Sequence, residues 1–144
     1  MMLSRARLTA WWNGRRFQDD RGDTSIQMAI VFPFVLLLTV AVIQASMWYY
    51  AREIALTAAR EGLSAARSYQ AGPEEGAARA RDVLDRTAGD SLMSSSVSTA
   101  GSGAQRVRIE VSGIAQSMLP GVPGLRITQS ASGTRERWTT PGAP

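Results

Sequence analysis

The chain has 144 residues, neither cysteine nor histidine, and a formal net charge of +4 that comes entirely from arginine. This composition excludes disulfides, thiolate or imidazole metal sites and the usual nucleophile–base pairs, so we expect no catalytic, metal-binding or cofactor-binding residue and no enzyme. The arginines are interspersed with acidic residues rather than clustered with aromatic ones, and we therefore expect no nucleic-acid partner.

An arginine-rich leader, residues 1–22, precedes a long uncharged stretch. No charged residue occurs between Asp23 and Arg52, and the most apolar part runs from Met28 to Tyr50. That length suffices for a bilayer core of about 30 Å at about 1.5 Å per helical residue. The sequence therefore predicts a transmembrane helix over residues 23–50, with an interfacial aromatic cluster at residues 48–50.

The distribution of arginine predicts the orientation of this helix. Five arginines precede it and three follow shortly after, which places the N-terminus in the cytoplasm and the C-terminal part outside. The apolar stretch is longer than the core of a cleaved secretory signal and lacks the small residues that end one, so we expect a retained anchor. Pro33 is expected to kink or loosen the helix, and the polar Gln27, Gln44 and Ser46 would favour partner helices.

The helical pattern continues beyond the aromatic cluster to Arg67. Small residues recur every three or four positions on one side, and the charged residues lie largely on the other. Such a seam lets backbones approach closely, in a bundle or against a sheet, although alanine is also simply a good helix former. We assign a role in assembly to four seam residues: Ala51, Ala55, Ala59 and Gly62.

The remaining residues predict a short helix and a small sheet. Gly72 and Pro73 mark the start of a helix that runs to about Thr87 and ends at Gly89. Strands are expected over residues 92–99 and 106–111, and a third starts at Leu125 and continues as far as Trp138. The predicted fold class is α+β, with an extracytoplasmic domain over residues 51–138 and a flexible tail over residues 139–144.

Three segments give the chain a family resemblance. The first is Asp20-Arg-Gly-Asp-Thr-Ser-Ile-Gln-Met-Ala-Ile-Val-Phe-Pro33, the second Ala58-Ala-Arg-Glu-Gly62 with Ala65-Ala-Arg67, and the third Val107–Val111 with Leu119-Pro-Gly-Val-Pro-Gly124. Their order and spacing resemble the TadE-like family, pilin-like components of the tight-adherence (Flp, type IVb-class) pilus system.

The resemblance implies a processing site and a set of partners. A prepilin peptidase would cut the leader between Gly22 and Asp23 on the cytoplasmic side of a bacterial membrane. Other pilins, the pilus assembly platform and the lipid bilayer would be the remaining partners. The residues implied for assembly include Gln27 and Pro33.

Gln27 departs from the pattern of prepilins, which carry glutamate at the fifth mature position. Glutamine can accept a hydrogen bond from a neighbouring subunit's terminal amine but cannot neutralise its charge. Two hypotheses remain open. Either Asp23 balances its own terminal charge, or the subunit acts as an assembly factor or cap outside the filament.

Two functions follow from these observations. The first is a structural, membrane-anchored pilin-like protein, either a minor pilin or an assembly factor. The alternative is a single-pass anchored binding module with an uncut N-terminus and no relation to pili. Cleavage after Gly22 distinguishes them.

Overall fold

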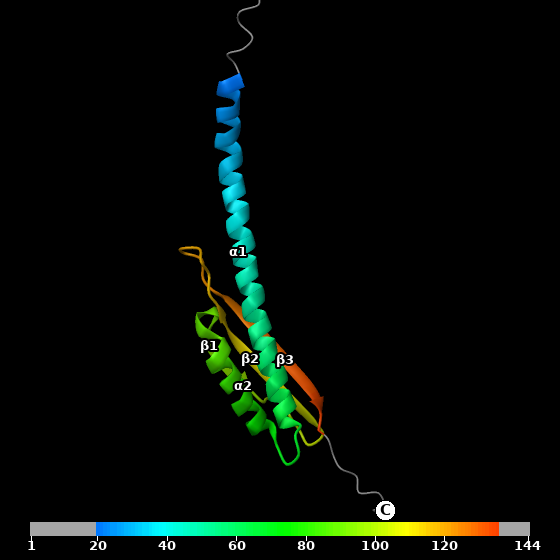
Figure 1. The fold of residues 1–144 in the computed structure, drawn as a ribbon. Coiled ribbons are helices and arrows are strands. Elements are labelled where there is room, and N and C mark those ends of the chain that lie inside the picture. The colour runs from blue at the N-terminus through cyan, green and yellow to red at the C-terminus, as the bar shows by residue number, and fades with distance from the viewer. Residues whose placement is uncertain (1–19, 136–144) are drawn as a thin grey trace, which may run out of the picture. The chain divides into compact units, whose positions relative to one another are not determined.

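A computed structural model describes residues 20–135, with side chains from residue 24 onward. It confirms the α+β class (Figure 1). The predicted leader up to residue 19 and the predicted tail lie outside the described residues. The elements, in chain order, are α1 Asp20–Ala66, α2 Pro73–Thr87, the 3-10 turn η1 Gly89–Ser91, β1 Leu92–Ser98, β2 Arg106–Ala115 and β3 Leu125–Thr134.

The chain divides into two compact units, Met1–Ala41 and Val42–Pro144, and α1 contributes to both. In the first unit, α1 begins at Asp20, ahead of Gly22, and remains helical through Pro33. The second unit begins at Val42, earlier than the domain boundary that the sequence predicts at Ala51. Residues 42–50 of α1 are therefore part of the unit that contains the sheet.

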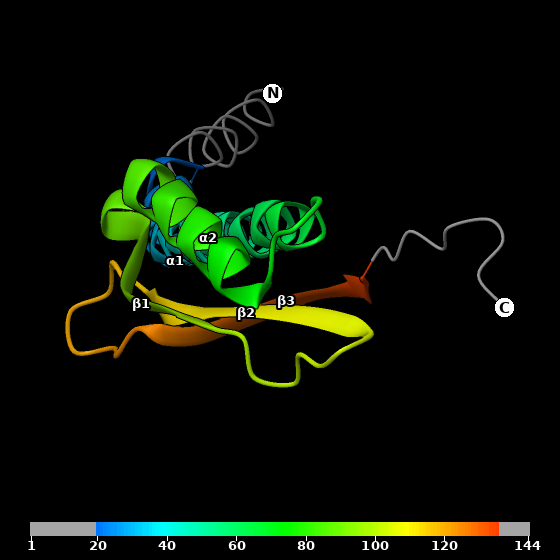
Figure 2. The ribbon, with the colours of Figure 1, turned by 90° about the horizontal axis from the view of Figure 1, so that it is seen from below.

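The second unit consists of a three-stranded antiparallel sheet in the order β1-β2-β3, covered on one face by α2 and by α1 from Val42 onward (Figure 2). The alternation in β2 explains this arrangement. Val107, Ile109 and Val111 are completely buried beneath the helices, because every second side chain of a strand points to the same face.

The opposite face of the sheet is mainly polar. The hydroxyls of Ser96 and Ser112 lie 2.9 Å apart across β1 and β2, and the guanidinium of Arg108 donates to the carboxylate of Glu110 at 2.8 Å. No helix among the described residues covers this face (Figure 2). The sheet is thus amphipathic, with one apolar and one solvated side.

The strands agree with the predictions in place but differ in length. β2 continues past Val111 to Ala115 with the same alternation of burial, although Gly113 supplies no apolar side chain at its buried position. A Cβ at position 113 would lie 2.6 Å from Cγ of Leu92, so glycine at this position leaves room for the Leu92 side chain. β3 ends at Thr134, and the predicted continuation from residue 136 to Trp138 lies outside the described residues.

The ends of α2 confirm the predicted signals. Pro73 is the first helical residue, and the Glu75 carboxylate accepts a hydrogen bond from the Gly72 N–H at 2.8 Å. Gly89 follows the helix with a φ of +46°, a conformation that glycine adopts at low cost. These local features fix the length of α2 and therefore how much of the sheet it covers.

Candidate processing, membrane and packing sites

The proposed cleavage bond lies within the first turn of α1. Gly22 and Asp23 are helical in backbone, although the Asp23 side chain falls outside the described part. A peptidase that binds an extended segment would have to unwind this turn first.

The first unit presents an apolar surface. Every side chain from Thr24 to Thr39 is exposed, including Gln27 and Pro33. The Thr39 hydroxyl donates to the Val35 carbonyl at 2.8 Å and so satisfies its polar group within the helix. An apolar surface of this extent requires lipid or protein around it.

In the part of the chain that the structure describes, α1 is the one helix long and apolar enough to cross a membrane, and none of its most apolar stretch is buried by the rest of the chain. This fits a single-pass membrane protein. No group of three or more potential metal ligands occurs among the described residues.

Gln44 has a different environment from the one expected. It is only 5% exposed, and its side chain bonds to the backbone after β2 rather than remaining available to a partner helix. Its Oε1 accepts from the Met118 N–H at 3.0 Å, and its Nε2 donates to the Gln116 carbonyl at 3.4 Å. This single side chain therefore ties the β2–β3 loop, residues 116–124, to α1.

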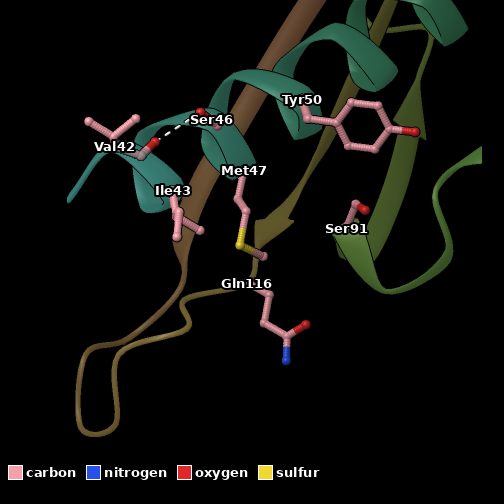
Figure 3. A pocket seen from close by; sticks show the side chains of 7 residues that line it. All are labelled: Val42, Ile43, Ser46, Met47, Tyr50, Ser91 and Gln116. Carbon is pink, nitrogen blue, oxygen red and sulfur yellow. Dashed lines mark hydrogen bonds between the residues drawn. The ribbon is translucent and has the colours of Figure 1, made fainter. Parts of the chain in front are cut away.

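A groove lies beside this attachment (Figure 3). The Ser46 hydroxyl donates to the Val42 carbonyl at 2.8 Å, within α1, so the groove is predominantly apolar despite that serine. Its lining residues are Val42, Ile43, Ser46, Met47, Tyr50, Ser91 and Gln116.

The three residues of the aromatic cluster predicted at residues 48–50 have different environments in the fold. Trp48 is half-buried and packs against the core, whereas Tyr49 and Tyr50 are exposed. The Trp48 indole N–H is buried without a hydrogen-bond partner among the described residues. Only the two tyrosines are free to meet an interface.

The small-residue seam of α1 packs inside its own chain. Ala51, Ala55 and Ala59 are completely buried, and Gly62 is buried as well. Close packing is thus present, against this chain's own sheet and α2. In this fold the four residues contribute to the core of the domain, and the role in assembly assigned to them stays a prediction.

The two helices approach each other closely at a pair of glycines. A Cβ placed on Gly62 would lie 2.6 Å from the Gly76 carbonyl oxygen, and one placed on Gly76 would lie 2.6 Å from both the Gly62 carbonyl oxygen and the Ala66 Cβ. Ile109 of β2 lies beneath both glycines. Neither position has room for a side chain.

Sequence reasoning identified Gly62 but not Gly76 or the role of Gln44. An isolated glycine within a helical pattern often has a packing reason, and that signal was present at Gly76. No local signal could pair Gln44 with Met118, because the contact joins residues 74 positions apart.

Comparison with known proteins addresses the same region. Residues 22–63 match the TadE-like protein family. The match starts at the proposed cleavage site, includes the apolar segment and ends one residue after Gly62, and it confirms the resemblance predicted from the sequence. The TadE-like segment thus comprises the candidate processing site, the candidate membrane helix and most of the buried seam. No match was found among curated proteins or among solved structures.

Replacing Gln44 with leucine is expected to loosen the β2–β3 loop. The Met118 N–H and the Gln116 carbonyl would lose their partner, at a cost of about 1 kcal/mol. Hydrogen exchange at the Met118 amide should then accelerate roughly fivefold. Gln105→Leu, the same chemical change at an exposed site, provides the control. Unchanged exchange at Met118 in the Gln44 variant would show that the loop is held by other contacts.

Proposed function

We propose that this chain is a membrane-anchored, pilin-like protein of a tight-adherence (Flp) pilus or a related secretion apparatus, with a structural rather than a catalytic role. The match of residues 22–63 to the TadE-like family carries the proposal. The exposed apolar helix supports a membrane anchor, and the small α+β domain supports a pilin-like architecture. Within this function the chain is a minor pilin or an assembly factor.

The topology and partners belong to the same proposal. The leader lies in the bacterial cytoplasm and the domain lies outside, as the balance of arginines favours. A prepilin peptidase removes the leader between Gly22 and Asp23, and the mature protein meets other pilins and the assembly platform within the membrane. The bilayer surrounds the exposed apolar part of α1.

The N-terminal sequence of the membrane-extracted protein tests this proposal. The full chain is produced with and without a prepilin peptidase, and each product is sequenced from its N-terminus. A mature form that begins at Asp23 only in the presence of the peptidase is the expected result. An intact leader under both conditions would instead favour the anchored binding module with an uncut N-terminus.

Gln27→Glu separates a filament subunit from an assembly factor. If the chain enters a filament, a carboxylate at this exposed position can pair with a neighbour's terminal amine, and a charge-assisted bond about 1.4 kcal/mol stronger would raise incorporation about tenfold. Incorporation is measured by immunoblotting sheared pili. Ser25→Glu adds the same charge two residues earlier and should not raise it. Unaltered incorporation and pilus yield in Gln27→Glu would count against a role for this position.

A further inference from the structure

We propose that the β2–β3 loop, residues 116–124, is a second membrane-contacting element, which enters the boundary between the headgroups and acyl chains of the bilayer beside α1. This inference depends on the membrane anchoring in the proposed function. It adds a separate contact with lipid, made by the domain rather than by the transmembrane helix.

The loop is fixed close to the uncharged part of α1. Gln44 holds the backbone of Gln116 and Met118 through the two hydrogen bonds already described. Gln44 lies within one helical turn of Ala41, where the first unit ends, and α1 is helical throughout this stretch. A bilayer that surrounds α1 just before Gln44 would therefore also lie near the loop.

The length of the exposed apolar helix places the edge of a bilayer at this level. From Thr24 to Ile43 there are 20 residues, which form about 30 Å of helix, the thickness of a bilayer core. Gln44 is the first buried polar residue after that span. The loop that it binds would thus lie at the interface rather than in the hydrocarbon centre, where unpaired loop backbone is not tolerated.

The composition of the loop suits that location. No charged residue occurs between Glu110 and Arg126, and the apolar side chains in and next to the loop point to solvent rather than into the core. Met118 is 63% exposed, and Val122 is 45% exposed. The loop lies at the end of the sheet where β2 passes to β3 (Figure 1, gold to orange). The other apolar residues exposed there are Leu119 and Leu125.

The residues that flank the loop are of the types found on the polar side of a membrane–water interface. A hollow between α1 and β3 is lined by Tyr49, Arg52 and Arg126 among others. Neither arginine forms an ion pair with another described residue. Aromatic rings and arginines next to an apolar element are the usual arrangement at the headgroup level, where guanidinium groups meet lipid phosphates. The two arginines and the exposed apolar side chains of the loop together favour a lipid surface, rather than a second copy of the chain, as the partner of this region.

Single-cysteine labelling tests the proposal, and the absence of natural cysteine makes it straightforward. Met118→Cys and Val122→Cys place an environment-sensitive nitrobenzoxadiazole label on the loop, at positions whose side chains are exposed. Ala100→Cys labels an exposed position in the β1–β2 loop, at the opposite end of the sheet. Leu37→Cys labels the apolar part of α1. The full chain is reconstituted in phosphatidylcholine–phosphatidylglycerol vesicles with or without spin-labelled lipid.

Labels at Met118 and Val122 are expected to show blue-shifted emission that shallow spin-labelled lipids quench, whereas the label at Ala100 shows neither effect. Quenching of the Leu37 label alone would overturn the loop proposal while leaving the membrane anchor intact. A blue shift at Met118 without lipid quenching would also overturn it, because protein would then cover the loop. Absence of quenching at Leu37 would contradict the membrane anchoring itself.

Discussion

Replacing Gly22 with leucine is expected to leave the leader uncut. If the peptidase subsite accommodates only a small side chain, the clash costs about 3 kcal/mol, which lowers the cleavage rate roughly a hundredfold. Leucine also favours helix over glycine by about 1 kcal/mol and so opposes unwinding of the first turn of α1. The fraction of mature protein after co-expression with the peptidase, measured by mass spectrometry, provides the readout.

Two further variants separate these causes. Gly14→Leu makes the same change elsewhere in the leader and should be cut normally. Gly22→Ala keeps the residue small but strengthens the helix, so slower cleavage in this variant would show that unwinding contributes. Efficient cutting of Gly22→Leu at the same bond would contradict the proposed processing site.

Gly62→Ala is expected to destabilise the domain by about 2 kcal/mol. Alanine normally stabilises a helix by about 1 kcal/mol relative to glycine. Here the added methyl group would lie 2.6 Å from the Gly76 carbonyl oxygen, and relieving that overlap by moving the two helices apart costs about 3 kcal/mol. The expected sign is therefore opposite to the one that helix propensity alone predicts.

Pulse proteolysis of the detergent-solubilised full chain in increasing urea measures this change. Gly103→Ala is the matched control, because a Cβ there meets nothing within 4 Å, and its stability should stay within about 0.5 kcal/mol of the parent. Equal stability of Gly62→Ala and the parent would mean that the helices can separate at little cost.

Local chemistry made several parts of the fold predictable. The alternation of Val107, Ile109 and Val111 indicated both the strand and its buried face, and Pro73 located the start of α2. The absence of charge before Arg52 indicated a long apolar helix but not where the folded domain begins to cover it. That point depends on the hydrogen bond between Gln44 and the β2–β3 loop, which only the folded chain brings together.

The small-residue seam shows the same limit. Its spacing correctly indicated a closely packed helix face, yet the identity of the partner could not be read from residues 51–62. A seam that meets another subunit and a seam that meets the chain's own sheet have the same pattern. Gly76 and Ile109 decide between them, because they fill the space opposite Gly62.

The polar face of the sheet has a consequence for how copies of the domain can associate. Its serine hydroxyls and the Arg108–Glu110 pair are exposed to solvent, and burying them without replacing their hydrogen bonds to water would cost free energy. Copies of the domain would therefore gain little free energy by associating through this face of the sheet.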